Sequence, residues 1–341
     1  MLCILGPTAS GKSALAMQLA ELEPRVEIIS MDSALVYRGM DIGTAKPTRA
    51  ELAQARHHLI DLIDPTESYS AARFVRDAQA VSKEVRARGG IPILVGGTML
   101  YYKAYVEGLD DLPSAPPEFR QAIAARAAVV GWPALHQELS VIDPPTAERL
   151  KPTDAQRISR ALELFQFTGK AMSELIHQSG ERVTPNTSER EALDTIALEP
   201  RDRAMLHARI AERFHTMLAQ GFLDEVRQLM ARGDLRPDLP SMRCVGYRQA
   251  WQHLSGETTW DEFIAAGIAA TRQLAKRQIT WLRSFQNVAR MDPFLNSESD
   301  HQSDPPSDHY SNHYSNHQGL RLVALTCADF THTIDQLALR G

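Results

Sequence analysis

Cysteines and long apolar runs are scarce in this sequence. The 341 residues include three cysteines, Cys3, Cys244 and Cys327, and no two of them form a C-x-x-C pair that could hold zinc or act as a redox couple. No apolar run approaches the roughly 20 residues that cross a bilayer. A glycine-rich motif beginning at residue 6 leaves no room for a cleaved export signal, so we expect a cytoplasmic protein without a membrane segment.

An excess of positive charge is also lacking, since the formal net charge is -5. Nucleic-acid binding relies on clustered Lys and Arg, and a negative total would ordinarily count against such a partner. Five of the 42 acidic residues, however, lie between residues 291 and 318, where there is no Lys or Arg. The rest of the chain balances 37 acidic against 37 basic residues, so the net charge excludes no class of partner.

Short apolar runs alternate with helical-looking segments in the first third of the chain. The runs cover residues 2–5, 26–29 and 91–95. This alternation predicts an α/β fold with a parallel sheet covered by helices. Polar signals follow each run, and ligands gather at the carboxyl ends of strands in such sheets, so we expect these signals to meet at one edge.

The composition changes at residue 112. A Leu-Pro-Ser-Ala-Pro-Pro stretch there is followed by Ala- and Arg-rich sequence up to about residue 191, which predicts a helical insertion over 113–192 between core parts 1–112 and 193–290. Thr153 and Gln156 have the spacing of a helix capping box within the insertion. With 43% apolar residues, the chain is long enough to give each part its own core.

The second core part is expected to hold a strand over 195–198 and two long helices. In the first helix the buried stripe would consist of residues spaced four apart, namely Leu206, Ile210, Phe214 and Leu218. Thr259 and Glu262 form a capping-box pattern that opens the second helix, which runs through about residue 285.

Residues 291–319 form a low-complexity tract rich in Ser, Asp, His and Asn, which is too polar to bury a core and is expected to be disordered. Its histidines are interpreted as solvated residues rather than as a metal site. The extension over 320–341 looks like a strand and a short helix whose packing partner the sequence does not indicate.

Residues 6–13 fit the phosphate-loop pattern G-x-x-x-x-G-K-S/T between a strand and a helix. In order they are Gly6, Pro7, Thr8, Ala9, Ser10, Gly11, Lys12 and Ser13. The glycines let backbone N–H groups point at phosphate oxygens, Lys12 adds a charge, and the Ser13 hydroxyl can ligate Mg²⁺. The pattern predicts binding of linked phosphates without saying that they belong to a nucleotide. Asp32, which follows the second strand, could position Mg²⁺ as in a kinase or serve as a turn residue.

Basic residues cluster at two places late in the sequence. Arg272, Lys276 and Arg283 are four and seven residues apart, so they share one face of the last long helix. Arg243 and Arg248 flank a Gly and a Tyr. Few acidic residues are interleaved, which favours RNA contact over a merely solvated surface.

Seven segments together resemble one family. They read GPTASGKS, MDSALVYRGMDIGTAKP, DPTESYSAARF, GGTMLY, DAQRISRALE, RCVGYRQ and ATRQLAKRQITWLRSF. From about residue 1 to 285 the sequence is similar to the tRNA dimethylallyltransferases, also called isopentenyl-diphosphate:tRNA transferases. The tail beyond about residue 290 departs from the family pattern, and nothing is carried over to it.

The resemblance implies a fold, ligands and contact residues. A phosphate-loop core would carry a helical insertion that grips the anticodon stem-loop, and residues 6–13 would cradle the diphosphate of dimethylallyl diphosphate with Mg²⁺ at Ser13. The pocket for the target adenine would be lined by Asp32, Ser33, Ala34 and Leu35. The implied tRNA contacts are Thr98, Arg120, Gln156, Arg157, Ile158, Ser159, Arg160, Arg243, Cys244, Val245, Gly246, Tyr247, Arg248, Lys276, Arg277, Gln278, Ile279, Thr280, Trp281, Leu282 and Arg283.

The chemistry of the implied reaction agrees with these residues. The N6 amine of adenine is a weak nucleophile, so a base must take a proton as the C–N bond forms, and Asp32 is the candidate. The leaving diphosphate gains negative charge that Lys12, Mg²⁺ and the loop amides stabilise. Thr8 or Ser13 would bridge the two groups, and we expect Asp32, Thr8 and Lys12 to be catalytic. A single-stranded anticodon loop is the favoured target because unstacking its adenine requires least energy.

Two other functions stay compatible with the motifs. One is a phosphate-loop kinase acting on a nucleotide or another small molecule, and the other is a non-catalytic RNA-binding module with a vestigial phosphate loop. Intact Lys12 and Ser13 count against the vestigial loop. We expect the protein to act as a monomer.

Overall fold

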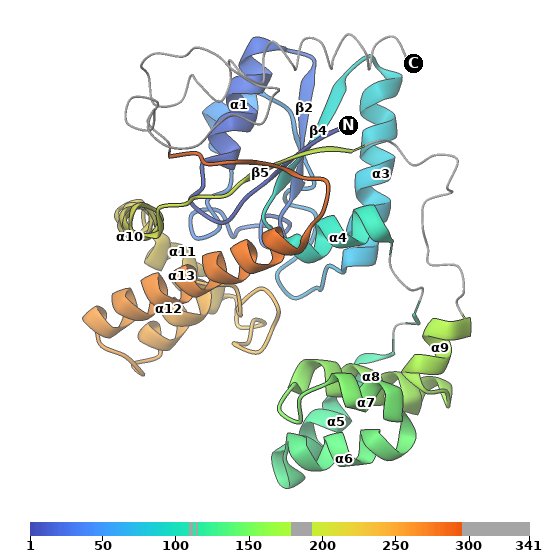
Figure 1. Cartoon of the computed structure of the whole chain (residues 1–341). Coiled ribbons are helices and arrows are strands. Elements are labelled where there is room, and N and C mark those ends of the chain that lie inside the picture. Colours follow the sequence, from blue (N-terminus) through green and yellow to red (C-terminus); the bar gives the residue numbers. More distant parts are fainter. Residues whose placement is uncertain (109–111, 114, 179–192, 295–341) are drawn as a thin grey trace, which may run out of the picture. The chain divides into compact units, whose positions relative to one another are not determined.

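The computed structural model describes residues 1–108, 112–113, 115–178 and 193–294. These residues belong to two compact units (Figure 1). One unit, here called the sheet unit, contains Met1–Val106 and the part of the chain from Glu191 onward. The other, here called the helical unit, contains Glu107–Arg190.

The sheet unit is built on a six-stranded sheet with the order β3-β2-β4-β1-β5-β6. Each neighbouring pair is parallel. The strands are β1 Leu2–Leu5, β2 Val26–Met31, β3 His57–His58, β4 Ile91–Gly96, β5 Asp194–Leu198 and β6 Ala289–Met291. β1 and β2 are buried at every residue, as expected for parallel strands that are covered on both faces. The predicted α/β fold with a parallel sheet is confirmed.

The outer strands β3 and β6 were not predicted. β3 is two residues long and pairs with Ile28 and Ile29, and β6 is three residues long and pairs with the end of β5. Strands this short leave no periodic pattern in a sequence. Met291, which the sequence analysis placed in the tail, is the last residue of β6.

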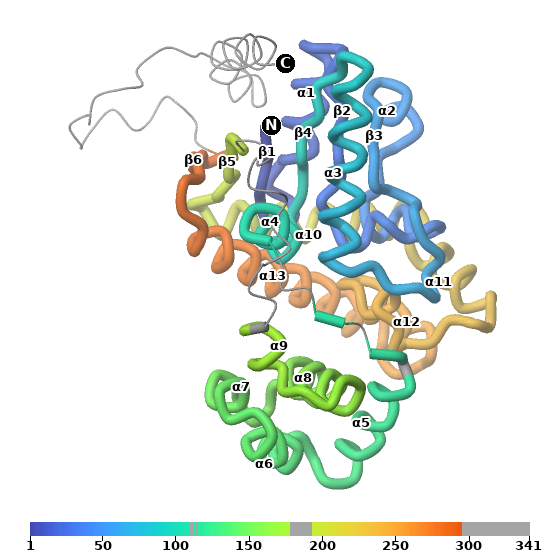
Figure 2. The backbone as a smooth tube through the Cα atoms, turned by 90° about the vertical axis from the view of Figure 1, so that its right-hand side faces the viewer, coloured from blue at the N-terminus to red at the C-terminus, as the bar shows by residue number. Residues whose placement is uncertain are grey.

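Helices cover the sheet and extend beyond it (Figure 2). In the sheet unit they are α1 Lys12–Leu22, α2 Arg49–Gln54, α3 Ala71–Ala87, α4 Met99–Glu107, α10 Arg203–Ala219, α11 Phe222–Ala231, α12 Tyr247–Leu254 and α13 Trp260–Ser284. α13 begins with the expected capping box, in which Thr259 accepts a hydrogen bond from the Glu262 amide and the Glu262 side chain accepts one from the Thr259 amide. Met217, rather than the expected Leu218, completes the buried stripe of α10.

α10 and α13 pack closely together because α13 carries a glycine at the contact. A Cβ on Gly267 would lie only 2.3 Å from a ring carbon of Phe214. Near the other end of α13, Ala275 and Ile279 form a small apolar cluster with Ile210 of α10. The position of α13 relative to α10 is therefore set by packing at two levels.

The helical unit consists of short helices around its own core. They are α5 Pro117–Val130, α6 Trp132–Ile142, α7 Pro144–Arg149, α8 Ala155–Thr168 and α9 Met172–Gln178. The core includes Ile123, Leu139 and Leu162, which are fully buried. The expected capping box of Thr153 and Gln156 is wrong, because α8 is capped by Asp154, whose carboxylate also pairs with the Arg157 guanidinium.

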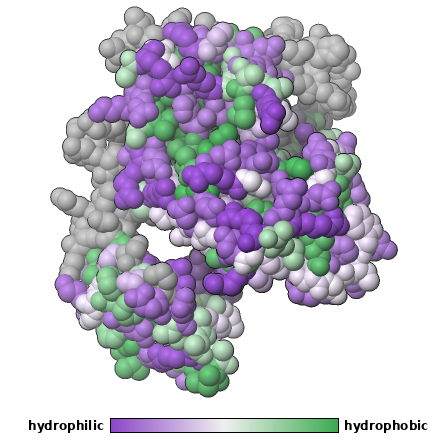
Figure 3. Space-filling view, turned by 180° about the vertical axis from the view of Figure 1, so that it is seen from behind, coloured by the Kyte–Doolittle hydropathy of each residue, from purple (hydrophilic) through white to green (hydrophobic). Residues whose placement is uncertain are grey.

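The expectations for residues 295–319 and for the extension over 320–341 lie outside the described residues. Within the described part of the chain, every helix is too short or too polar to span a bilayer. On the face seen in Figure 3, hydrophilic residues cover most of the visible surface and apolar residues appear in smaller groups.

Candidate active site

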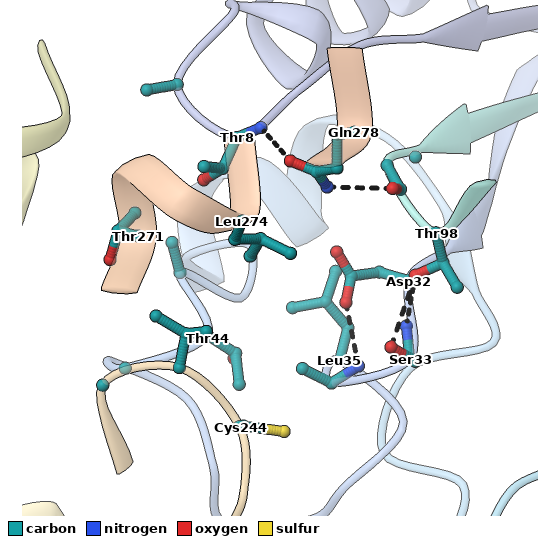
Figure 4. A pocket seen from close by; sticks show the side chains of 18 of the residues that line it. Thr8, Asp32, Ser33, Leu35, Thr44, Thr98, Cys244, Thr271, Leu274 and Gln278 are labelled. Atoms are coloured by element: carbon teal, nitrogen blue, oxygen red, sulfur yellow. Dashed lines mark hydrogen bonds between the residues drawn. The ribbon is translucent and has the colours of Figure 1, made fainter. Parts of the chain in front are cut away.

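The loops that follow β1, β2 and β4 meet at one pocket of about 550 Å³ in the sheet unit (Figure 4). These are the three polar signals that the sequence placed at one edge of the sheet. The predicted site residues that line the pocket are Thr8, Ala9, Lys12, Ser13, Asp32, Ser33, Ala34, Leu35, Thr98, Arg243, Cys244, Val245, Gly246, Tyr247, Arg277, Gln278 and Trp281. Chain segments about 200 residues apart in sequence therefore share one cavity.

The phosphate loop contributes a positive charge to this pocket. Gly11 has a φ of +92°, a conformation that glycine adopts readily, and it leads directly into α1. Lys12 follows it and donates a hydrogen bond to the carbonyl of Pro7 at 3.4 Å. The pKa of Lys12 is lowered to about 8, mainly by burial and to a smaller extent by the charge of Arg213, whereas the charge of Asp32 acts in the opposite direction.

Asp32 faces the phosphate loop from the end of β2. Its Oδ1 accepts a hydrogen bond from the Ala34 amide at 2.8 Å, which fixes the carboxylate against its own loop. The neighbouring Ser33 amide donates to Thr98 Oγ1 at 3.0 Å, so the loops after β2 and β4 are joined beside the carboxylate. Among the described residues no hydrogen bond to Asp32 Oδ2 is seen, and this oxygen is available to a ligand.

Arg213 is a pocket residue that the sequence analysis missed. It lies on α10 and lines the pocket together with Lys12. Burial lowers the pKa of its guanidinium, while the negative charge of Asp32 acts in the opposite direction. Its position next to Phe214, on a helix that the sequence identified as amphipathic, was the available signal, because an Arg beside a buried stripe lies close to the protein interior.

Gln278 of α13 forms hydrogen bonds with two of the pocket loops. Its Oε1 accepts from the Thr8 amide at 2.9 Å, and its Nε2 donates to the carbonyl of Gly97 at 2.8 Å. Figure 4 shows this side chain between the loop that carries Thr8 and the loop that carries Thr98. The amide of Gln278 is thus engaged at both ends within the protein.

Glu225 organises the wall opposite the phosphate loop. Its carboxylate accepts hydrogen bonds from three consecutive backbone amides, those of Asp41, Ile42 and Gly43, at 2.6 to 3.1 Å. It also accepts one from the hydroxyl of Tyr247. One half-buried side chain therefore holds the loop over 41–43 against the segment that contains Tyr247.

Apolar side chains complete the cavity. The pocket is lined by Ile210, Phe214, Met217, Phe222 and Leu274 from three helices. The loop over 41–43 packs tightly against this apolar surface. A Cβ on Gly43 would lie 2.2 Å from a ring carbon of Phe222 and 2.6 Å from one of Tyr247. The cavity thus joins a cationic end, a carboxylate and an apolar surface.

Metal binding by protein groups alone is not supported. In the part of the chain that the structure describes, no three His, Cys, Asp or Glu side chains come together as metal ligands. Ser13, in the first turn of α1, lines the pocket and offers one hydroxyl oxygen. This arrangement fits Mg²⁺ that takes most of its ligands from phosphate oxygens and water.

Comparison with known proteins identifies the family. Residues 35–285 match the family model described as IPP transferase. The chain is 63% identical over 283 residues to a tRNA dimethylallyltransferase of Ralstonia nicotianae, covering 83% of this chain and 87% of the relative. The chain belongs to the IPP transferase family.

Solved structures of similar proteins agree with this assignment. A tRNA isopentenylpyrophosphate transferase from Bacillus halodurans is 38% identical, with a TM-score of 0.60 over 85% of this chain and 89% of that one. A eukaryotic dimethylallyltransferase that was solved acting on tRNA is 27% identical, with a TM-score of 0.65 over 83% of this chain and 69% of that one. The fold of this IPP transferase is therefore that of its solved relatives.

The basic face of α13 is less uniform in this IPP transferase than its sequence suggests. Arg272 and Lys276 are exposed, but Arg283 forms an ion pair with Glu199. Ile279 and Leu282, which the resemblance placed among the tRNA contacts, are buried. Between Arg272 and Arg283 the helix has no acidic residue, but Glu199, which follows β5, supplies a negative charge to Arg283.

The other expected tRNA contacts of these segments differ in exposure. Tyr247 is fully buried, whereas Arg243 and Arg248 on either side of it are exposed. Thr280 donates to the carbonyl of Lys276 within α13. The cations of these segments are thus exposed, whereas Tyr247, Ile279 and Leu282 are buried.

In the helical unit, the five residues from Gln156 to Arg160 lie at the start of α8. Gln156 and Arg157 are exposed, whereas Ile158 and Ser159 are buried. Arg160 donates to the carbonyl of Pro113.

The remaining expected contact, Arg120 on α5, pairs with Glu163. Glu163 is almost fully buried and also accepts a hydrogen bond from the Ser159 hydroxyl at 2.7 Å. The Arg120 side chain itself is 66% exposed, so the pair leaves much of this cation accessible.

Proposed function

We propose that this protein transfers a dimethylallyl group from dimethylallyl diphosphate to N6 of the adenosine 3′ of the anticodon in tRNA. The observation that carries the proposal is one pocket in which the phosphate-loop Lys12 and the Asp32 carboxylate meet beside an apolar wall. Relatives that are up to 63% identical bear the name tRNA dimethylallyltransferase. We further propose that the protein acts as a cytoplasmic monomer.

The donor would bind with its diphosphate at the phosphate loop and its five-carbon chain on the apolar wall. The N-terminus of α1, which begins at Lys12, would direct the positive end of the helix dipole at the anion. Lys12 and Arg213 add two positive charges at the same end of the pocket. Bound Mg²⁺, held through Ser13 and the diphosphate oxygens, would neutralise part of the charge of the leaving group.

The acceptor adenine would lie against Asp32, Ser33, Ala34 and Leu35. In the transfer, the bond between the first carbon of the dimethylallyl group and a diphosphate oxygen breaks, and its electron pair leaves with the diphosphate. A bond from N6 to that carbon forms, and Asp32 takes the N6 proton as general base. Thr8 and Ser13 lie on the donor side of the same pocket, where their hydroxyls can bridge the reacting groups.

The exposed cations would hold the RNA. Arg272 and Lys276 in the sheet unit, and Arg120 and Arg157 in the helical unit, carry charge that can contact phosphates. The adenine must leave its stack to enter the pocket, which requires a few kcal/mol and least in a single-stranded loop. This energy difference favours an anticodon loop over a duplex as the target.

The test compares two donors with and without RNA. The protein is incubated with Mg²⁺ and either dimethylallyl diphosphate or ATP, in the presence and absence of bulk tRNA, and release of diphosphate and phosphate is followed. We expect diphosphate release from dimethylallyl diphosphate that depends on tRNA. Release of phosphate from ATP alone would indicate a kinase or NTPase, and no release with either donor would indicate a non-catalytic RNA-binding protein.

A further inference from the structure

Gln278 occupies a place in the pocket that differs from an RNA contact. It belongs to α13, yet its two hydrogen bonds reach residues 270 and 181 positions away in sequence, Thr8 and Gly97. These two residues lie in the loops that follow the adjacent strands β1 and β4. One side-chain amide thus joins both loops at the edge of the sheet where the pocket opens (Figure 4).

The protein packs closely around the side-chain amide of Gln278. A Cβ on Gly97 would lie 2.6 Å from Gln278 Nε2 and 2.9 Å from the carbonyl oxygen of Gly6, so only glycine leaves room there. The helix is held on both sides of the contact by the buried residues Ala275 and Ile279. Packing of α13 therefore determines where the amide of Gln278 lies, and the two loops follow it.

Gly97 is also connected to the loop that carries Asp32, the proposed base. Gly97 is followed by Thr98, whose Oγ1 accepts the Ser33 amide at 3.0 Å. Ser33 in turn follows Asp32. The opposite end of the Gln278 amide holds Thr8 in the phosphate loop at 2.9 Å. Gln278 therefore links the donor loop to the base loop through side-chain hydrogen bonds.

We propose that Gln278 is a positioning residue that fixes the distance and orientation of the donor loop relative to Asp32. This inference rests on the proposed function, because it assigns to these loops the donor diphosphate and the base of one transfer reaction. Gln278 acts through the loops that it holds. Group transfer requires reacting atoms about 3–3.5 Å apart and aligned, and a misplacement of about 1 Å lowers the rate roughly 10²-fold.

The same geometry predicts which properties of the protein should stay unchanged when the amide of Gln278 is removed. The Thr8 amide is engaged by Gln278 and is not a free donor for phosphate, so diphosphate binding falls to the other loop amides, Lys12 and Arg213. Its partners Thr8 and Gly97 engage the oxygen and the nitrogen of its amide, so one of the two N–H groups of Gln278 is already used and any RNA contact is limited to the other. Loss of the amide should therefore reduce turnover while leaving the two binding equilibria near their original values.

The experiment uses the full chain with Gln278→Met, which keeps the length and helix preference of the side chain and removes its polar groups. Gln273→Met is the matched control, because Gln273 is an exposed glutamine of the same helix that does not line the pocket. The measurements are kcat and both KM values for transfer to tRNA, and the dissociation constants of inorganic diphosphate and of tRNA. For Gln278→Met we expect kcat to fall by about 10²-fold with both dissociation constants close to wild type. The control should behave as wild type.

Three results would overturn the positioning role. Unchanged kcat would make the amide a packing group, a fall in tRNA affinity alone would make Gln278 an RNA contact, and a loss confined to diphosphate affinity would limit it to shaping the phosphate loop. Absence of transfer by the wild-type protein would instead refute the proposed function, so the two failures are distinguishable.

A second variant covers the case in which Gln278→Met does not fold. Gln278→Glu keeps an acceptor for the Thr8 amide but offers no donor to the Gly97 carbonyl. Its added charge weakens diphosphate binding, so the readout is kcat at saturating donor and tRNA. A reduced kcat supports the positioning role, and a wild-type kcat under these conditions contradicts it.

Discussion

The sheet unit and the helical unit hold their polar side chains in different ways. In the sheet unit, hydrogen bonds at the pocket join residues far apart in sequence, such as Thr8 and Gln278, which are 270 positions apart. In the helical unit the corresponding pairs are nearer in sequence, such as Arg126 and Glu138, which are 12 apart. The pocket therefore depends on the whole sheet unit, whereas the ion pairs of the helical unit join helices that lie within one short stretch of sequence. Substitutions at the pocket should act on chemistry, and those at the ion pairs of the helical unit on stability and, at its exposed cations, on RNA affinity.

The largest effect is expected at Asp32. Asp32→Asn keeps the size of the side chain and an acceptor for the Ala34 amide but cannot take a proton, so kcat should fall by about 10²- to 10⁴-fold. Donor and tRNA affinities should stay near wild type. A magnesium titration on the variant distinguishes base from metal ligand, because rescue of the rate by extra Mg²⁺ would contradict the role as base.

A smaller loss is expected when the charge at the phosphate loop is removed. Lys12→Ala should weaken diphosphate affinity by about 10- to 100-fold, since a hydrogen bond to a charged group contributes about 1.5–3 kcal/mol. Its tRNA affinity should be unchanged, which filter binding or calorimetry can verify. Unaltered turnover in this variant would refute the donor site.

The pH dependence of diphosphate affinity gives an independent test of the same residue. The pKa of Lys12 is lowered to about 8 in the free protein, so Lys12 is charged below that pH and becomes neutral above it. Diphosphate affinity should hold steady up to about pH 8 and decline as the pH rises further. In Lys12→Ala this decline should be reduced, and an identical pH profile in both proteins would assign the titration to another group.

The basic face of α13 should contribute to tRNA affinity in a way that depends on the salt concentration. Arg272→Ala with Lys276→Ala removes two exposed cations, so the slope of log tRNA affinity against log salt should flatten by about 1.4 to 1.8. Adding Arg283→Ala should change the slope less than either of the others, because Glu199 already neutralises Arg283. A slope that is unchanged in the triple variant would make this face a solvated surface.

The smallest effect is expected within the helical unit. Arg126 and Glu138 form a partly exposed ion pair, so a double-mutant cycle to Ala should give a coupling free energy of about 0.2–1 kcal/mol in urea unfolding. Arg120→Ala should be more destabilising, by about 1–3 kcal/mol, because it leaves the buried carboxylate of Glu163 with one fewer partner. Equal effects of the two substitutions would contradict the distinction between exposed and buried pairs.

The sequence predicted those parts of the site that follow from local patterns. The phosphate loop, the strand before it and the position of Asp32 after β2 were all readable, because glycine spacing and apolar runs determine local backbone geometry. The helix start at Thr259 was readable for the same reason. Asp154 at the start of α8 was missed because Thr153, one residue earlier, has an equally plausible capping sequence.

The parts that were not predicted depend on tertiary contacts. Arg213 and Glu225 belong to no motif, and their roles arise because α10 and α11 come to lie beside loops about 180 to 200 residues earlier in sequence. Gln278 was assigned to RNA from its segment alone, and its hydrogen bonds to Thr8 and Gly97 become visible only when the helix is placed. A single sequence carries no information on such pairs.

Gly43 constrains the order in which this pocket can change during evolution. With the ring carbons of Phe222 and Tyr247 within 2.2 and 2.6 Å of where its Cβ would lie, any larger residue at position 43 must be preceded by smaller residues at the two ring positions. This order leaves a cavity in the meantime, which lowers stability but does not create a clash. When this wall of the pocket changes in evolution, we therefore expect the first substitution at residue 222 or 247. A substitution of Gly43 should follow only afterwards.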